Sequence, residues 1–251
     1  MGKRLANRRQ ARRNEDYGDT QDNIYPIASN RVPKKDFELK PKNEGQLKLI
    51  NAIDNFSVVC VTGGAGTGKT FVSTVLAAKE LKAGNIEKLV LVRANEPLGP
   101  SLGMLKGSLF EKQKPWLAPY LPALLSVFSL TELQYLMQED KSKIEMVAVE
   151  HLRGLSFNNT WVVGDEIQNI SYEAMKCLLL RIGEGSKLIL CGDIAQCDIN
   201  PSTSGLNLLL DIDESFAGHK PFKVVELVGC VRSQVAAYFM KAIELLESEG
   251  G

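Results

Sequence analysis

Short apolar runs of four or five residues recur along the chain between positions 58 and 227. Glycine, proline or polar residues bound them, and longer stretches with helical spacing separate several of them. Runs of this length and composition are typical of strands that a sheet buries on both faces. Six strands are predicted, at 58–61, 89–92, 145–149, 160–163, 188–191 and 223–227.

Helical periodicity is clearest on either side of the first predicted strand. Residues 43–55 carry leucine and isoleucine at helical spacing, and the stretch from Lys69 to Gly84 does the same with valine and leucine. Strands that alternate with helices predict an α/β fold, a mostly parallel sheet with helices on both faces, in a single domain. Prolines and glycines at 97–125 predict a loop with short helices.

The first 36 residues differ from the rest of the chain. They are polar, lack periodicity, and within residues 1–13 hold six basic residues and no acid. We expect 1–36 to be a disordered tail and 37–251 to form the folded domain. A solvated tail, an arm that contacts nucleic acid and a partner-docking segment all fit this composition. Beyond residue 13 the balance is 24 basic against 30 acidic residues, which excludes a globally basic nucleic-acid binder.

The cysteines and the lengths of the apolar runs indicate the compartment in which the protein is expected. Five cysteines, an odd number without C-x-x-C spacing, favour neither a disulfide framework nor a zinc site, and they fit a reducing compartment. No apolar run approaches 18 residues, so no membrane span is expected. The expected location is the cytoplasm, or the host cytoplasm if a phage encodes the chain.

The strongest motif lies at residues 63–70 and matches G-x-x-x-x-G-K-[ST]. Such a loop directs backbone N–H groups and a helix N-terminus at phosphate oxygens. Lys69 is expected to reach the β- and γ-phosphates of ATP, and Thr70 to ligate Mg²⁺. The predicted nucleotide-binding residues are Gly63, Gly64, Ala65, Gly66, Thr67, Gly68, Lys69 and Thr70.

A second motif ends the strand at 160–163 with two acids. Asp165 is expected to hold Mg²⁺, and Glu166 to act as the general base for the attacking water. An acidic pair at a strand end is a weak signal by itself, because it also suits a solvated end or a helix cap. Its combination with the phosphate loop makes the catalytic interpretation strong.

Four other residues have weaker support from spacing alone. Gln196 follows a later strand and fits a γ-phosphate sensor or a surface turn, with Asp193 as a turn or cap residue. Arg232 precedes the last predicted helix, where surface arginines are also common. Gln46 is a candidate adenine reader. Trp116 lies among lysines and suits either a base-stacking platform or a loop anchor.

These blocks together resemble the PhoH-like ATPases over residues 43–245. The matching segments are VTGGAGTGKT (61–70), LVRANEPLGPSLGMLKGSLFEKQKPWLAPY (91–120), HLRGLSFNNTWVVGDEIQN (151–169), ILCGDIAQCDI (189–199) and VGCVRSQVAAY (228–238). The stretch 102–120 matters most, because P-loop proteins in general do not share it. The short length and polar N-terminus are similar to those of members carried by tailed phages.

The resemblance implies a RecA-like fold similar to one motor domain of a superfamily 1 helicase. It implies ATP hydrolysis with Gln196 as γ-phosphate sensor and Arg232 as finger arginine, and it places Arg93 where helicase relatives contact nucleic acid. The chain departs from the family pattern at four positions. Gly164 and Ile167 fall in GDEIQ, where the family usually has DEAQ after an aliphatic residue; Asn95 and Ser233 also differ.

The predicted function is a Mg²⁺-dependent ATPase that acts on single-stranded RNA or DNA as a ring oligomer. If Arg232 acts as a finger, a chain with one RecA-like domain must supply it to a neighbouring subunit's ATP, and the resemblance implies a hexamer. One alternative is a nucleotide-gated binding module with slow hydrolysis and no unwinding. The other is a small-molecule or nucleoside kinase, which the pair Asp165 and Glu166 and the lack of an Arg-rich lid disfavour.

Overall fold

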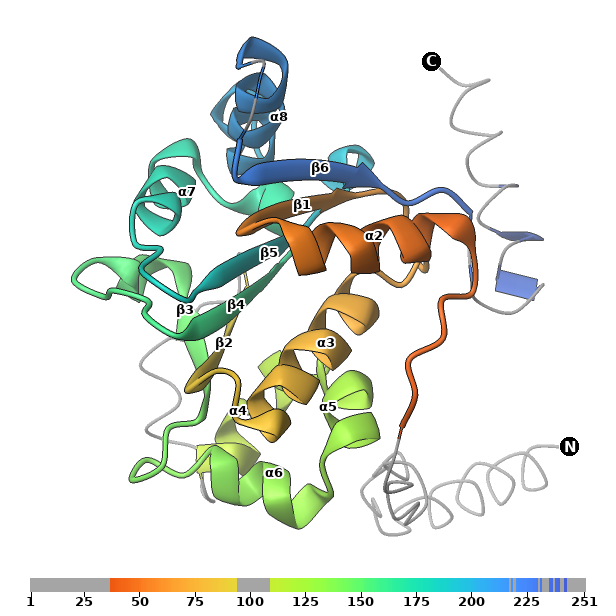
Figure 1. The fold of residues 1–251 in the computed structure, drawn as a ribbon. Helices are drawn as coiled ribbons and strands as arrows, with labels where there is room; N and C mark the ends of the chain where they lie inside the picture. The colour runs from red at the N-terminus through yellow and green to blue at the C-terminus, as the bar shows by residue number, and fades with distance from the viewer. Residues whose placement is uncertain are drawn as a thin grey trace, which may run out of the picture. The chain divides into compact units, whose positions relative to one another are not determined.

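The computed structural model describes residues 37–93, 109–216, 218, 220–229 and 231, with positions 235, 236, 238, 239 and 242. The predicted tail at 1–36 lies outside the described residues. In the labels of Figure 1, the helices are α2 (Glu44–Asn55), α3 (Lys69–Ala83), α4 (Leu109–Leu117), α5 (Leu121–Val127), α6 (Leu130–Leu136), α7 (Tyr172–Leu179) and α8 (Gly205–Ser215). The strands are β1 (Val58–Thr62), β2 (Lys88–Arg93), β3 (Ile144–Ala148), β4 (Thr160–Asp165), β5 (Lys187–Cys191) and β6 (Phe222–Glu226).

The strands form one sheet, in the order β3-β2-β4-β5-β1-β6. Every neighbouring pair in it is parallel. Strand β5 therefore lies between the strand that leads into the phosphate loop, β1, and the strand that ends in the acidic pair, β4. The predicted α/β, RecA-like fold with a mostly parallel sheet is confirmed. All six predicted strands are present, and each boundary agrees to within two residues.

The side chains of each central strand alternate between the two faces of the sheet. In β1, Val59 and Val61 pack with helices α2, α3 and α5, whereas Cys60 packs with α7 and α8. Strands β2, β4 and β5 divide their residues in the same way. Figure 1 shows these two groups of helices on opposite faces of the sheet. The continuous apolar runs in the sequence follow from this burial on both faces.

The segment predicted as loop and short helices contains α4 and α5 within its described part, and α6 follows it. Helix α5 packs along α3. Tyr120, fully buried before α5, donates a hydrogen bond from its hydroxyl to the carbonyl of Val92 at 2.8 Å. This bond ties the inserted helices to the carboxyl end of β2. Across the described residues, no helix has the length and apolar character needed to cross a membrane.

The last predicted helix differs from expectation in its exposure. The helical spacing of Val235 and Phe239 predicts that both lie on the core face of this helix, but the two residues are 66% and 58% exposed. The prediction of a core face is therefore wrong for these two residues. Periodicity shows that one side of a helix is apolar, but it does not show which surface covers that side.

The two cysteines of the central strands should resist alkylation. Cys60 and Cys191 are fully buried; burial raises the pKa of the Cys191 thiol to about 12 and also raises the pKa of Cys60. The thiolate is the reactive form, so iodoacetamide at neutral pH should modify the partly exposed Cys177 and Cys197 first. Peptide mass mapping measures each site, and the same reaction in denaturant is the control. Equal native rates at Cys191 and Cys197 would contradict this burial.

A buried hydroxyl in α3 should reduce the stability of the fold. The Thr74 hydroxyl has no hydrogen-bond partner among the described residues, although the residue is fully buried. We expect Thr74→Val to raise the free energy of unfolding by about 1 kcal/mol, because it removes an unsatisfied polar group at nearly constant volume. Urea denaturation measures the change. The neighbouring Ser73 contacts Cys191 at 3.5 Å, so Ser73→Ala is a control that should give no gain.

Candidate functional site

The predicted catalytic residues that the structure describes come from one edge of the sheet. The phosphate loop follows β1, Asp165 ends β4, and the turn that holds Gln196 follows β5. All these strands are parallel, so their carboxyl ends lie on the same side of the molecule (Figure 1). This is the edge at which open α/β sheets bind their ligands.

The phosphate loop depends on glycine at two positions. Gly63 has a φ of +133°, and a side chain there would bring its Cβ to 2.2 Å from the carbonyl oxygen of Leu227. Gly68 has a φ of +92° and forms the N-cap of α3. Residues with a Cβ rarely adopt these conformations, so glycine allows the chain to turn directly from β1 into the N-terminus of α3. That N-terminus carries the positive end of the helix dipole.

Contacts from outside the loop set the direction of its peptides. The Gln46 side chain donates from Nε2 to the Thr67 carbonyl at 2.9 Å, and the Val231 N–H donates to the Gly66 carbonyl at the same distance. In a trans peptide the C=O and the following N–H point in opposite directions. The N–H groups of Thr67 and Gly68 follow the carbonyls of Gly66 and Thr67 in the chain. They therefore point away from Val231 and Gln46, which contact those carbonyls.

Gln46 engages its own chain through both ends of its carboxamide. Its Oε1 accepts from the N–H of Lys42 at 2.9 Å, its Nε2 contacts Thr67, and the residue is only 4% exposed. In this arrangement Gln46 braces the phosphate loop. Its role as an adenine reader stays a prediction.

The Lys69 ammonium lies over the phosphate loop. It donates to the carbonyl of Gly63 and, at 3.0 Å, to the carbonyl of Gly64. An ammonium group has three donors and strong attraction to oxygen, so phosphate oxygens can replace these carbonyl contacts without moving the helix that carries Lys69.

Thr70 and Asp165 form the contact that joins the phosphate loop to the acidic strand. The Thr70 hydroxyl donates to Asp165 Oδ1 at 2.7 Å, although 95 residues separate the two positions. Burial raises the pKa of Asp165, and the Thr70 hydrogen bond and the charge of Arg93 oppose that rise. A hydroxyl and a carboxylate in contact are hard oxygen donors, which suit Mg²⁺ with its preference for oxygen ligands.

Arg93 ends β2 and aligns with Asp165 across the β2–β4 pair. Its charge opposes the rise that burial causes in the pKa values of Asp165 and Tyr120. Arg93 thus lies within electrostatic reach of Asp165. Trp116, in α4, is only 9% exposed, so little of its ring is available for stacking on a base. The nucleic-acid roles of both residues stay predictions.

Glu166 has an uncommon backbone conformation. Its φ is +54°, in the left-handed region that residues with a side chain adopt infrequently. The chain then enters a 3₁₀ turn, Ile167–Asn169, and the amide of Gln168 donates to Glu166 Oε2 at 2.6 Å. Strained conformations of this kind often occur at active sites, where the surrounding structure enforces them.

Gln196 ends a 3₁₀ turn, Ile194–Gln196, that follows β5. Its side-chain amide donates to Asp193 Oδ2 at 2.8 Å. Asp193 also accepts from the N–H of Ala195 and caps the turn, as expected from the sequence.

Arg232 lies outside the described residues, so its predicted role as a finger stays a prediction.

Sequence reasoning did not identify Gln168 as a functional residue. The GDEIQ block contained the signal, since Gln168 lies two residues after the predicted base. Its partners in the turn after β5 are 25 to 28 residues away, and only the fold brings them together.

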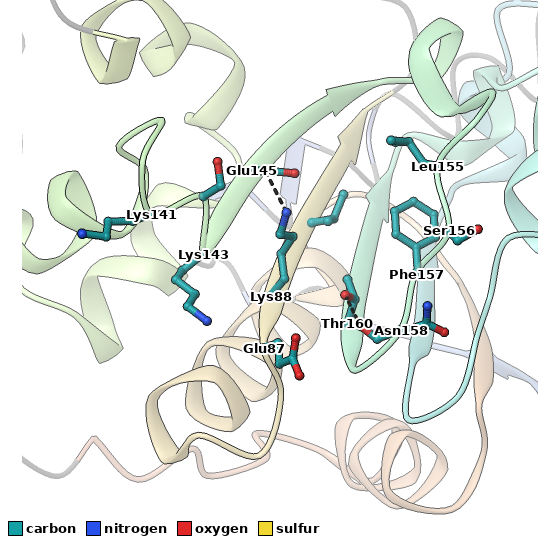
Figure 2. Close-up of a pocket in the computed structure, with 12 residues that line it drawn as sticks. Glu87, Lys88, Lys141, Lys143, Glu145, Leu155, Ser156, Phe157, Asn158 and Thr160 are labelled. Atoms are coloured by element: carbon teal, nitrogen blue, oxygen red, sulfur yellow. Dashed lines mark hydrogen bonds and ion pairs between the residues drawn. The ribbon is translucent and has the colours of Figure 1, made fainter.

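A hollow lies at the opposite edge of the sheet, where β2, β3 and β4 begin. Its volume is about 340 Å³, and mostly charged and polar residues line it, together with apolar residues such as Leu155 and Phe157 (Figure 2). Lys88 and Glu145 in its wall form an ion pair at 2.9 Å. This hollow contains none of the predicted catalytic residues, so the candidate site remains the edge with the phosphate loop.

Known proteins resemble this chain in sequence over most of its length. The model of the family "PhoH-like protein" matches residues 38–244. Protein PhoH of Escherichia coli K12 is 33% identical over 192 residues, which cover 76% of this chain and 52% of that protein. The PhoH-like protein of Bacillus subtilis 168 is 37% identical over 161 residues, covering 64% and 50%.

The chain spans about half the length of these two relatives. Among solved structures, "The Phi-28 gp11 DNA packaging Motor" is 16% identical, with a TM-score of 0.41 over 75% of this chain and 60% of that one. This structural similarity is too low to support an inference. The family match and the sequence identities show that the chain belongs to the PhoH-like family, and its phosphate loop is that of a P-loop protein.

Proposed function

We propose that the protein hydrolyses ATP in a Mg²⁺-dependent reaction at the edge formed by the phosphate loop and the acidic pair. The observation that carries this proposal is the 2.7 Å contact between Thr70 and Asp165. It brings the last residue of the phosphate loop motif against Asp165, the last residue of β4, which Glu166 follows directly. In this proposal, phosphate binding, metal ligation and a general base would meet in one place.

Each residue has a distinct task in the proposed reaction. Lys69 exchanges its contacts with Gly63 and Gly64 for oxygens of the β- and γ-phosphates. Thr70 and Asp165 hold Mg²⁺, which when bound offsets charge on the phosphates. Glu166 accepts the proton of a water molecule as that water's oxygen bonds to the γ-phosphorus and the bond to the β–γ bridging oxygen breaks.

We further propose that the protein acts as a homo-oligomer on single-stranded nucleic acid. The folded part provides one RecA-like domain, so a finger role for Arg232 requires a neighbouring subunit's ATP. The resemblance to superfamily 1 helicase motors supports single-stranded RNA or DNA as the partner and a hexameric ring as the assembly. Gln196, at the end of the turn after β5, would sense the γ-phosphate.

A nucleotide-gated binding module is the second candidate, and the burial of Trp116 favours it. A stacking platform must expose a ring face, and this ring is 9% exposed. ATP turnover measured with and without single-stranded RNA and DNA separates the two. Several-fold stimulation supports the motor, and slow turnover indifferent to either polymer supports the gated module.

Removal of Lys69 or Glu166 should separate binding from hydrolysis. Lys69→Ala should lower kcat by at least about a hundredfold, because it removes a charge that stabilises the transferring phosphoryl group. Glu166→Gln should lower kcat by a similar factor and still bind ATP, since the base takes little part in binding. Phosphate release and equilibrium ATP binding measure the two effects.

The matched control for these substitutions is Lys79→Ala, which removes an exposed lysine from the same helix as Lys69. It should leave kcat unchanged. Hydrolysis by Lys69→Ala at the rate of the unsubstituted protein would refute the proposed site.

Arg232→Ala should abolish turnover if the arginine acts on a neighbour's ATP. Co-expressed oligomers that mix Arg232→Ala with Glu166→Gln subunits should recover part of the activity. In such a mixture a Glu166→Gln subunit supplies its arginine to a site that retains the base. Phosphate release by purified mixed oligomers measures the recovery, and a chain with both substitutions is the control. No recovery at any ratio would argue against action between subunits.

A further inference from the structure

The carboxamide of Gln168 joins the proposed base to the segment that carries Gln196. Gln168 is fully buried. Its Nε2 donates to Glu166 Oε2 at 2.6 Å and to the Gln196 carbonyl at 3.2 Å, while its Oε1 accepts from the N–H of Asp193 at 3.0 Å. One side chain thus uses both its donor and its acceptor atoms to connect the turn after β4 with the turn after β5.

The backbone of Gln168 is held separately from its side chain. Its carbonyl accepts from the Ser204 hydroxyl at 2.7 Å and from the Cys197 thiol at 3.3 Å. These contacts fix the turn Ile167–Asn169 whatever side chain stands at position 168. The side-chain bonds are therefore additional to those that maintain the local fold.

We propose that Gln168 is a positioning residue that orients the Glu166 carboxylate and couples it to the segment 193–196. This inference rests on the proposed hydrolysis. An amide neither gives nor takes a proton near neutral pH, so Gln168 cannot replace the base. By holding Oε2 of Glu166, it leaves the other carboxylate oxygen to accept the proton of the attacking water.

The contacts form a continuous chain from the base to the proposed sensor. Gln168 binds the N–H of Asp193, and the carboxylate of Asp193 accepts from the side chain of Gln196. A γ-phosphate that draws the Gln196 amide toward itself would break the last of these bonds. The rearrangement of 193–196 would then reach Glu166 through Gln168, so that the base responds to the γ-phosphate.

The Asn169 side chain also joins the turn after β4 to the turn after β5, and it does so without contacting the Glu166 carboxylate. Asn169 Nδ2 donates to Asp198 Oδ2 at 3.0 Å, and the N–H of Asp198 donates to Asn169 Oδ1 at 2.7 Å. This pair is exposed to solvent. It provides a matched control, because Asn169→Ala loosens the connection between the segments but leaves the contacts of the base intact.

The test compares Gln168→Met with Asn169→Ala in ATP hydrolysis by the full chain. Methionine preserves side-chain length and removes all three bonds. We expect Gln168→Met to lower kcat by at least about tenfold, because hydrogen bonds to charged groups contribute that much, with KM for ATP changed by less than about threefold. Asn169→Ala should retain kcat.

A double-mutant cycle tests the coupling to the sensor. If Gln168 acts through Gln196, the losses in kcat from Gln168→Met and Gln196→Ala should be less than multiplicative when combined. Should Gln168→Met fail to fold, Gln168→Asn serves in its place, since it stays polar but is too short to reach both segments. A thermal melt and an ATP-binding measurement confirm that each variant is folded.

Three outcomes would overturn the inference. The first is an unchanged kcat for Gln168→Met, and the second is an equal loss for Asn169→Ala, which would indicate a structural role only. The third is a multiplicative combination with Gln196→Ala. If the unsubstituted chain hydrolyses no ATP, the proposed function itself fails, and that result is distinct from all three.

Discussion

The site depends on the contact between the Thr70 hydroxyl and the Asp165 carboxylate. One partner belongs to the first turn of α3 and the other to the end of β4. They can meet only if α3 starts where it does and β4 ends at the same edge, with β5 between β1 and β4. The register of the parallel sheet, together with the glycine conformations at Gly63 and Gly68, satisfies this requirement.

Side-chain size next to the acidic pair explains two departures from the family pattern together. A Cβ at Gly164 would lie 3.2 Å from Ile167 Cγ2 and 3.0 Å from Leu190 Cδ2. A Cβ at Gly192 would lie 2.8 Å from Ile167 Cγ1. The two glycines therefore leave the space that the fully buried Ile167 occupies. Ile167, after the acids, is larger than the alanine that the family usually has there, and Gly164, before them, has no side chain. The two differences compensate in volume, as close packing requires.

The strands and the phosphate loop were predictable from the sequence because their signals are local. Burial on both faces gives continuous apolar runs, and the loop needs its glycines, lysine and threonine in adjacent positions. The alignment of Arg93 with Asp165 was not predictable, because it depends on which strands pair. The burial of Trp116 and the contacts of Gln168 depend in the same way on segments that lie far apart in the chain. The exposure of Val235 and Phe239 shows the same limit of a local pattern.

Every polar side chain of the proposed machinery that the structure describes has an internal partner. Lys69 contacts loop carbonyls, Thr70 contacts Asp165, Glu166 contacts Gln168, and Gln196 contacts Asp193. Binding of a nucleotide with its metal must therefore exchange hydrogen bonds, and each exchange contributes only a small net free energy. In return, the groups are oriented before the substrate arrives, which lowers the ordering cost of binding and of the reaction. The contact of Glu166 with Gln168 is the one that need not be exchanged. A carboxylate has two oxygens, so Glu166 can keep Gln168 on Oε2 while its other oxygen accepts a proton.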